Sequence, residues 1–328
     1  MTENLYPLKF KTIFKDKIWG GNKINAVLCK DFGDLPNCGE TWEISGVEGD
    51  ISIVADGALA GRSLVELIES YQGDLLGFKV YNKYGSQFPL LVKFIDANAD
   101  LSIQVHPDDE LAKARHNSFG KTEMWYVFQA DEGSSLISGF NQPVDKEAFL
   151  DKFNSGRLMD ILNREKVKAG DVFFIPAGRV HTIGKGLLLA EIQQTSDITY
   201  RIYDFDRVDS NGQKRELHVE EALDAIDYSF YDHYRVPYGD QKNTPVELVS
   251  CDYFTTNKIT INQTLERDYS DLDSFIIYIC FDGDLILDYA GGKVAVKKGD
   301  AVLLPAKLKR VKLIPTETCK ILESYIDR

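Results

Sequence analysis

Apolar positions in this chain cluster in many short runs that favour strands over helices. The runs are rich in Val, Ile, Phe and Tyr, and Gly, Asp or Pro residues bound them. Many short strands at this spacing are typical of antiparallel sandwiches or barrels rather than of alternating strand–helix folds. The predicted strands are Leu90–Ile95, Leu101–Val105, Met124–Gln129, Asp171–Ile175, Leu187–Gln193, Thr199–Tyr203, Thr255–Ile261, Phe275–Phe281, Leu285–Tyr289, Ala301–Leu304 and Cys319–Ile326.

Helical patterns are fewer. Ser63–Ser70 begins with a capping pattern, and Asp108–His116 is predicted as a short helix or turn. Lys146–Asn163 is predicted as a helix, either continuous or broken at Gly156. In Val219–Ile226 the apolar residues share one helical face. These segments all precede residue 227, so we expect the helices to belong to the N-terminal part of the protein.

An internal repeat predicts two related lobes. The segment VKAGDVFFIPAG at 167–178 recurs as VKKGDAVLLPAK at 296–307, an offset of 129 residues. This offset places Arg310 at the position of His181, and the similarity of WYVFQADEG to IIYICFDG places Phe275 at the position of Glu123. We therefore expect chemistry only in the first lobe. The predicted division is 1–236, a polar linker at 237–245 containing Gly and Pro, and 246–328.

Candidate metal ligands lie in three segments of the first lobe. Gln104 and His106 are two positions apart on an extended segment, as are Lys121 and Glu123, so each pair shares one face. His181 follows an Ile-Pro-Ala-Gly turn at the end of a predicted strand. Imidazole nitrogens with a carboxylate or amide oxygen suit catalytic zinc. The same donors also suit iron(II), so the ligand types do not select the metal.

Each candidate ligand has an ordinary structural explanation when it is considered alone. His106 precedes a proline and is compatible with an exposed turn, while Glu123 is compatible with a surface strand that pairs with Lys121. The metal hypothesis is favoured because the candidates occur together in the one lobe whose repeat lacks them. His116, His218 and His233 have no matching partners and are interpreted as surface residues.

Positive charge near the candidate ligands suggests a small anionic substrate. Arg201 lies on a strand with aromatic neighbours, and a guanidinium in a cleft suits an enediolate or a phosphate. The alternative is an ion pair with Asp204 or Asp206, which follow closely. Trp19 is a candidate wall of a sugar site, although most tryptophans belong to a core. Together these residues favour a metal-dependent enzyme acting on a small charged molecule.

Composition excludes several other classes. The net charge of −13 argues against a nucleic-acid partner, because phosphate backbones require a basic surface. The longest apolar run, Phe275–Phe281, is too short to cross a bilayer, and the N-terminus lacks the pattern of an export signal. The five cysteines are scattered without a C-x-x-C pair, which argues against a disulfide framework. We therefore expect a cytoplasmic protein with no nucleic-acid or membrane partner; the oligomeric state stays open.

Several motifs together resemble the type I mannose-6-phosphate isomerases, zinc enzymes of the cupin superfamily. The resemblance runs from near the N-terminus to about residue 207, and the remainder is similar only to a second cupin lobe. Its order of HPD, KTEMWY and PAG-x-VH segments is specific. The matching segments are 18–21 (IWGG), 40–43 (ETWE), 89–97 (PLLVKFIDA), 101–108 (LSIQVHPD), 121–127 (KTEMWYV), 175–184 and 200–207.

The resemblance implies a mainly β fold of two cupin-like jelly-roll barrels and one zinc ion per chain. The ion would be held by His106, Glu123 and His181, with Gln104 as a fourth ligand in the longer family members. The interval between Glu123 and His181 leaves no room for the large helical insertion of those members, so the chain resembles the short bacterial form. Any phosphate contacts made by the insertion are therefore in doubt.

The resemblance also implies an activity and further site residues. The expected reaction is reversible interconversion of mannose 6-phosphate and fructose 6-phosphate through an enediol(ate). Arg201 would be catalytic and Lys121 would face the substrate, with Lys93 as a weaker candidate for binding it. The general base stays open among Lys121, Glu43 and a zinc-bound water. The alternatives are a non-catalytic cupin that binds sugar phosphates and an iron(II) oxygenase that uses the same His-Glu-His set.

Overall fold

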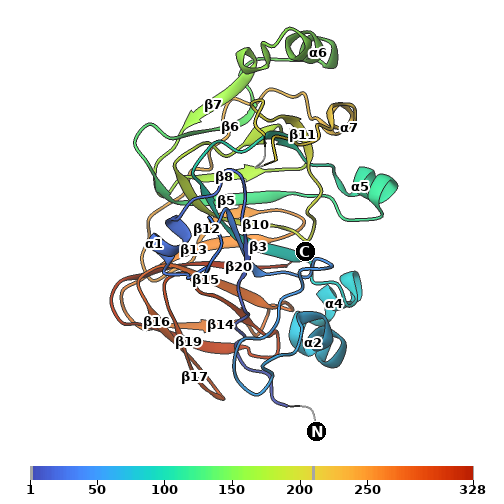
Figure 1. The fold of residues 1–328 in the computed structure, drawn as a ribbon. Helices are drawn as coiled ribbons and strands as arrows, with labels where there is room; N and C mark the ends of the chain where they lie inside the picture. The colour runs from blue at the N-terminus through green and yellow to red at the C-terminus, as the bar shows by residue number, and fades with distance from the viewer. Residues whose placement is uncertain (1–2, 209–210, 328) are drawn as a thin grey trace.

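The computed structural model describes residues 3–208 and 211–327, whose strands form four antiparallel sheets. We call the two sheets nearer the N-terminus the first lobe and the other two the second lobe (Figure 1). In the first lobe, one sheet has the order β1 (Ile13–Lys15), β2 (Glu40–Ile44), β3 (Leu90–Ala97), β10 (Leu187–Gln194), β5 (Glu123–Ala130) and β8 (Val172–Ile175). Facing it is a sheet with the order β11 (Tyr200–Tyr203), β4 (Ile103–Val105), β9 (His181–Thr182), β6 (Ser135–Phe140) and β7 (Leu162–Lys166).

The second lobe repeats this arrangement. Its first sheet has the order β12 (Val246–Ser250), β13 (Thr255–Ile261), β20 (Cys319–Tyr325), β15 (Ile276–Asp282) and β18 (Ala301–Leu304). Its second sheet has the order β14 (Leu265–Asp268), β19 (Arg310–Pro315), β16 (Leu285–Tyr289) and β17 (Gly292–Val296). The predicted β-rich, antiparallel character of the chain is therefore confirmed.

Alternation of side chains along the strands gives each sheet two packed faces. In β5, Trp125 and Val127 pack inside the first lobe, whereas Met124 and Tyr126 pack against the second lobe. From the second lobe, Ile277 of β15 and other apolar residues of its first sheet complete this shared core. The molecule is therefore a stack of sheets in which apolar cores lie within each lobe and between the lobes (Figure 1).

Some helices pack into the core between the lobes, and others cover the outer face of the first lobe. The α-helices of the described residues all lie before residue 226: α1 (Lys23–Leu28), α2 (Leu64–Tyr71), α3 (Gly73–Leu76), α4 (Phe78–Tyr84), α5 (Asp109–His116), α6 (Lys146–Asn154) and α7 (Val219–Ala225). Phe149 of α6 and Ala222 of α7 pack on the outer face of the sheet that carries β4 and β9. In Figure 1 these two helices form the end of the molecule opposite the second lobe.

Three predicted helices are confirmed and one is corrected. The capping pattern at Ser63 is present as a reciprocal hydrogen-bond pair that begins α2, and Asp108 caps α5. The helix predicted over Lys146–Asn163 ends at Asn154, and a short 3-10 turn and β7 follow. The break occurs at Gly156, whose φ of +69° lies outside the helical region and suits glycine. The prediction missed α1, α3 and α4 and several strands, from the two-residue β9 to the six-residue β6 and β19.

The repeat seen in the sequence falls on equivalent strands. The offset of 129 residues carries Val172–Ile175 of β8 onto Ala301–Leu304 of β18, and the sheet order around each strand is the same. The strand register corrects the residue that sequence similarity placed at the position of Glu123. Glu123 pairs with Ile175, and Leu304, which is equivalent to Ile175, pairs with Ile276. Ile276, not Phe275, therefore occupies the position of Glu123. The sequence similarity had paired Tyr126 with Tyr278, but these rings face different cores.

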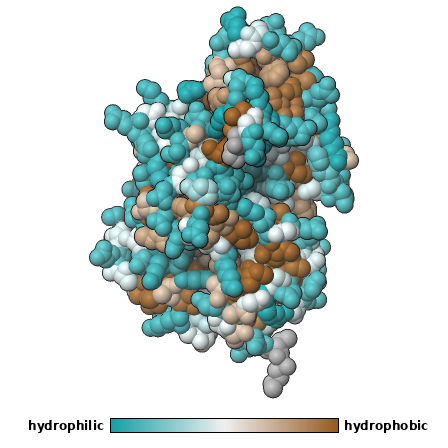
Figure 2. Space-filling model, viewed as in Figure 1, coloured by the Kyte–Doolittle hydropathy of each residue, from teal (hydrophilic) through white to brown (hydrophobic). Residues whose placement is uncertain are grey.

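The surface agrees with the composition. The face shown in Figure 2 is largely hydrophilic, with apolar residues scattered between charged ones. Among the described residues, no helix has the length and apolar character needed to cross a membrane.

Candidate metal centre

Three side chains that are far apart in sequence converge between the two sheets of the first lobe. His106 directly follows β4, His181 begins β9, and Glu123 begins β5 in the facing sheet. Each of the three offers a donor atom, and these atoms lie within 4.8 Å of one another. All three residues are buried, and Glu123 and His181 are 0% exposed. The fold therefore assembles the predicted His-Glu-His group in its interior.

The distances within this group fit a single ion. Nε2 of His106 lies 3.6 Å from Oε2 of Glu123, and Nε2 of His181 lies 3.5 Å from Oε1. Bonds of about 2 Å to one tetrahedral zinc ion give ligand separations of about 3.3 Å. Nε2 of His106 and Oε1 of Glu123 are buried without a hydrogen-bond partner among the described residues, and Oε2 of Glu123 lies 3.1 Å from the Lys121 ammonium. Buried polar atoms are normally paired, so this cluster of acceptors suits a cation.

Backbone carbonyls fix the orientation of both imidazole rings. Nδ1 of His106 lies 2.8 Å from the Ile198 carbonyl oxygen, and Nδ1 of His181 lies 2.8 Å from that of Arg179. Because a carbonyl only accepts, Nδ1 carries the proton in each ring and Nε2 keeps its lone pair. Burial lowers the pKa of His181 to about 4 and lowers that of His106 well below its usual value. Both rings are therefore held neutral, as metal ligands must be.

Gln104 and Lys121 each contact one member of the His-Glu-His group and also line a neighbouring cavity. Gln104 sits opposite His181 in the β4–β9 pair, and its amide nitrogen lies 3.2 Å from Nε2 of that ring. Lys121 places its Nζ 3.1 Å from Oε2 of Glu123. Burial, together with the nearby Glu191 carboxylate, raises the pKa of Glu123 despite the lysine. The side chains of Gln104 and Lys121 both line a cavity above the ligand group.

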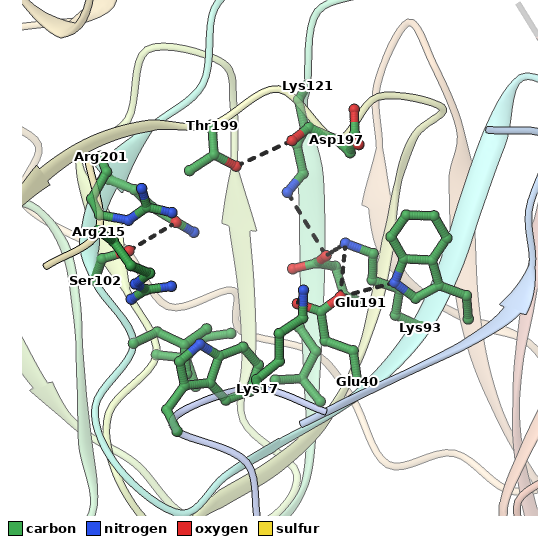
Figure 3. A pocket seen from close by; sticks show the side chains of 16 residues that line it. Lys17, Glu40, Lys93, Ser102, Lys121, Glu191, Asp197, Thr199, Arg201 and Arg215 are labelled. Atoms are coloured by element: carbon green, nitrogen blue, oxygen red, sulfur yellow. Dashed lines mark hydrogen bonds and ion pairs between the residues drawn. The ribbon is translucent and has the colours of Figure 1, made fainter. Parts of the chain in front are cut away.

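This cavity has a volume of about 320 Å³ and two charged walls (Figure 3). Arg201 and Arg215 extend from one side, while Lys93, Lys121 and Glu191 extend from the other. A volume of this size is in the range of small-molecule sites. The remaining lining residues include aromatic, aliphatic and hydroxyl side chains: Trp19, Trp42, Ile95, Leu101, Ser102, Ile183 and Thr199.

The carboxylates of Glu191 and Glu40 hold the Lys93 side chain in place on one wall of the cavity. Nζ of Lys93 lies 3.2 Å from Oε1 of Glu191 and 3.9 Å from Oε2 of Glu40. Burial alone would raise the pKa of Glu40, but Lys93, Lys17 and a hydrogen bond from Trp42 lower it to about 2. The Glu191 carboxylate also has a lowered pKa, because Lys121 and Lys93 outweigh its burial. Both carboxylates are therefore ionised at neutral pH, and Glu191 and Glu40 together raise the pKa of Lys93 despite its burial.

Arg201 lines the cavity and does not form the ion pair with Asp204 or Asp206 that was its alternative explanation. Its Nη1 donates to the backbone oxygen of Glu216 at 2.7 Å, and no carboxylate of the described residues lies within ion-pair distance. Asp204 is instead bound by Arg207 and Arg215. The alternative explanation, that Asp204 pairs with Arg201, is therefore wrong. The buried Nε of Arg201 has no described hydrogen-bond partner. Its charge is therefore left available to the cavity.

Other candidates lie elsewhere. Glu43 is bonded to Lys30 at 2.9 Å and is not among the described residues that line the cavity. His116 contacts the Tyr200 hydroxyl, and His233 is exposed. His218 was expected on the surface, but it is half-buried and its Nδ1 accepts the backbone N–H of Arg201. Glu43 therefore lies outside the wall of the cavity.

Sequence reasoning missed the roles of Glu191 and Arg215. Glu191 had a detectable signal, because it is a lone charge inside the apolar run LLLAEI. Arg215 had none, since it comes from an irregular segment that only the fold brings to the cavity.

Two family models match this chain. Residues 7–131 match the catalytic domain of type I phosphomannose isomerase, and residues 244–326 match the cupin domain of mannose-6-phosphate isomerase. The chain is 36% identical to mannose-6-phosphate isomerase ManA of Bacillus subtilis over 94% of its length and 95% of the relative. It is also 36% identical to the mannose-6-phosphate isomerase of Streptococcus mutans, over 92% of its length and 93% of the relative.

The chain belongs to the type I phosphomannose isomerases.

Solved structures of this family share the fold. The mannose 6-phosphate isomerase of Bacillus subtilis superposes with a TM-score of 0.88 at 35% identity, covering 98% of this chain and 99% of that one. The phosphomannose isomerase of Salmonella typhimurium superposes with a TM-score of 0.81 at 16% identity, covering 98% and 100%. At 16% identity the second comparison shows only that the two proteins share the fold.

Proposed function

We propose that this chain is a zinc-dependent mannose-6-phosphate isomerase that interconverts mannose 6-phosphate and fructose 6-phosphate through an enediol(ate). The single observation that carries this proposal is the buried His106–Glu123–His181 group, which contacts Gln104 and Lys121 in the wall of a charged cavity. The names of the close relatives support the substrate. The expected partner is therefore a sugar phosphate.

His106, Glu123 and His181 would hold the ion, and Gln104 is placed to be a fourth ligand. Amide oxygen and nitrogen differ only by a flip of the side chain, so Gln104 can turn its oxygen toward the position now faced by its nitrogen. Zinc bound there would polarise a substrate oxygen and stabilise negative charge on it. The mixed imidazole and carboxylate set suits zinc and also accommodates iron(II), and metal analysis decides between them.

Charged residues of the cavity would bind and orient the substrate. Arg201 and Arg215 form a wall suited to phosphate, and a guanidinium binds such oxygens through a fixed set of donors. Arg201 would also stabilise the enediolate charge, the kind of preorganised electrostatic effect that often contributes most to a rate. On the facing wall, Lys93 and Lys121 would contact sugar oxygens, and Trp19 would pack against the ring.

Proton transfer would use the lysine wall. Lys121 is 5% exposed and lies 3.1 Å from Glu123 and 3.9 Å from Glu191, so it is held close to the proposed metal position. This placement suits a group that donates a proton to a substrate oxygen or stabilises it as it becomes charged. Among the side-chain candidates for acid–base catalysis, Lys121 lines the cavity and Glu43 does not.

We further propose that the two lobes are cupin-like barrels that divide at residues 237–245. The shared sheet order supports this division, and so does the family match over residues 244–326. In this arrangement 1–236 is the catalytic unit and 246–328 is a lobe without metal ligands.

The decisive experiment combines metal analysis with a coupled assay. The purified chain would be stripped with a chelator and reloaded separately with Zn²⁺ or Fe²⁺, and conversion of mannose 6-phosphate to fructose 6-phosphate would be followed. We expect about one zinc per chain, loss of turnover on stripping, and recovery with Zn²⁺. Full turnover by a chain shown to contain no metal, or no turnover by a fully loaded chain, would contradict the proposal.

A further inference from the structure

A hydrogen-bond chain crosses from the second lobe to the segments that carry the metal-facing residues. Tyr253, in the turn between β12 and β13, donates its hydroxyl to Oδ2 of Asp109 at 2.8 Å. Asp109 is the first residue of α5 and lies three positions after His106. One oxygen of this carboxylate therefore contacts the second lobe, while its helix begins beside the proposed metal centre.

The other carboxylate oxygen of Asp109 ties two further segments together. Oδ1 accepts the backbone N–H of Gly120 at 2.8 Å and the side-chain amide N–H of Gln194 at 2.9 Å. Gly120 precedes Lys121, and Gln194 is the last residue of β10. The Asp109 side chain thus connects the segment after His106 to both strands that approach Glu123.

Gln194 extends this connection to the residue next to Glu123. Its side-chain oxygen accepts the backbone N–H of Thr122 at 2.8 Å, and Gln194 is only 4% exposed. The hydroxyl of Thr122 accepts the backbone N–H of Ala177 at 3.2 Å, in the turn that leads to His181. A single, partly buried network therefore reaches the backbone near all three proposed ligands.

We propose that Tyr253 and Asp109 are positioning residues through which the second lobe fixes the geometry of the metal centre. Metal ligands must converge within a few tenths of an ångström, and outer-shell groups that orient them are known to affect affinity. Here the constraint acts on the backbone at Gly120 and Thr122, which sets the position of Glu123. The inference rests on the metal centre of the proposed function.

The first test is Tyr253→Phe, which removes only a hydroxyl. Loss of an outer-shell partner typically weakens metal binding about 10–100-fold. Asp109 contacts the backbone beside the ligands rather than a ligand, so we expect a smaller loss for Asp109→Ala, about 3–10-fold, and about 2–3-fold for Tyr253→Phe, which acts one bond further away. Zn²⁺ affinity would be measured by competition with a chromophoric chelator, and the absorption spectrum of the Co²⁺-loaded protein would report ligand geometry.

Tyr238→Phe is the matched control. Its hydroxyl is bonded to the Gly170 carbonyl oxygen, and it lies in the cleft between the lobes, away from the metal-facing residues. We expect this variant to keep the Zn²⁺ affinity and the Co²⁺ spectrum of the unmodified chain, even if its melting temperature falls. A structural role alone would shift the melting temperatures of the two tyrosine variants and leave metal affinity unchanged in both.

A double-mutant cycle completes the test. If Tyr253 acts through Asp109, Tyr253→Phe has no further effect on Zn²⁺ affinity in the Asp109→Ala background. Unchanged affinity in Tyr253→Phe, or an equal loss in both backgrounds, overturns the inference. The titrations use no sugar phosphate, so a chain that binds metal without isomerising mannose 6-phosphate would refute the proposed activity while leaving this result readable.

Discussion

The two lobes use the same sheet order for different chemistry. The order β2-β3-β10-β5-β8 recurs as β12-β13-β20-β15-β18, and β4-β9-β6-β7 recurs as β14-β19-β16-β17. Among the described residues, the second lobe has no counterpart of β11, the strand that carries Arg201. At the remaining site positions the strands are retained and the side chains differ. The scaffold alone therefore does not make a site.

One buried carboxylate is present in both lobes and shows this most directly. Glu191 pairs with Trp125 across β10 and β5, and Glu323 pairs with Tyr278 at the equivalent register of β20 and β15. In the first lobe, Oε2 of Glu191 accepts a hydrogen bond from Trp125 at 2.9 Å, and Oε1 lies 3.2 Å from Nζ of Lys93. Glu191 and Lys93 both line the cavity, so this ion pair faces the cavity.

In the second lobe the same position is fully bonded. Glu323 is 0% exposed and accepts hydrogen bonds from Arg267 at 3.1 and 3.0 Å and from Asn257 at 3.0 Å, as well as from Tyr269. Every oxygen of this carboxylate has a partner. The comparison indicates that one lobe places its buried carboxylate in the wall of a cavity and the other uses it to hold its strands together.

The largest expected effect comes from His181→Ala. This change removes one of three ligands, so we expect zinc content to fall from about one ion per chain to near zero and turnover to be lost with it. Outer-shell changes alone cost about 10–100-fold in affinity, and loss of a ligand should exceed that. Metal analysis after gel filtration provides the measurement. An unchanged zinc content would remove His181 from the ligand set.

Arg201→Ala separates electrostatic stabilisation from metal binding. We expect turnover to fall about 10²–10³-fold, as when a preorganised donor to a developing charge is removed, while zinc content stays the same. Steady-state kinetics and metal analysis on the same sample provide the test. Simultaneous loss of metal would show that Arg201 supports the fold of the site instead, through its bond to the Glu216 carbonyl.

These two residues also show how far the sequence could predict the site. His181 and Arg201 lie in segments whose residue types and order are informative by themselves. The surroundings of Arg201 were not predictable, because Asp204 is closer in sequence but is held by Arg215 from a later loop. Glu40 and Glu191 depend on cross-strand pairing with Lys93, and no local pattern records which strands become neighbours.

The predicted fold succeeded and failed for similar reasons. Long strands such as β3 and β10 have apolar runs that signal them, whereas β9 has two residues and exists because it pairs with β4 and β6. A one-residue alignment error at Tyr126 was invisible in the sequence, since both strands are apolar on both faces. Only the register could place Ile276 opposite Leu304.

Arg267→Met tests the structural role of the second lobe. Removing one partner of a buried ion pair leaves an uncompensated charge, which typically costs about 3–5 kcal/mol. Because the Arg267 side chain is 21% exposed, we expect the lower end, about 3 kcal/mol, together with unchanged zinc content. Urea unfolding followed by circular dichroism measures the loss. Unaltered stability would mean that Glu323 is neutralised in another way.

Lowering the pH should weaken metal binding at the first lobe. Burial raises the pKa of Glu123 in the metal-free chain, so below that pKa a proton occupies the carboxylate and must leave when the ion binds. Affinity therefore rises with pH and falls by about tenfold per unit on the acidic side. Zn²⁺ titrations at several pH values test this dependence, and a pH-independent affinity would argue against Glu123 as a ligand.

The smallest effect is expected for Arg310→Ala, at the position that corresponds to His181. Arg310 pairs with Asp268 in β14 as His181 pairs with Gln104 in β4, but its side chain is 79% exposed. Exposed ion pairs contribute little to stability, so the melting temperature, zinc content and turnover should all stay within experimental error. A marked loss of turnover would show that the outer sheet of the second lobe takes part in the reaction. The expected contrast with His181→Ala, at one position of a common scaffold, would assign the chemistry to the side chains that converge there.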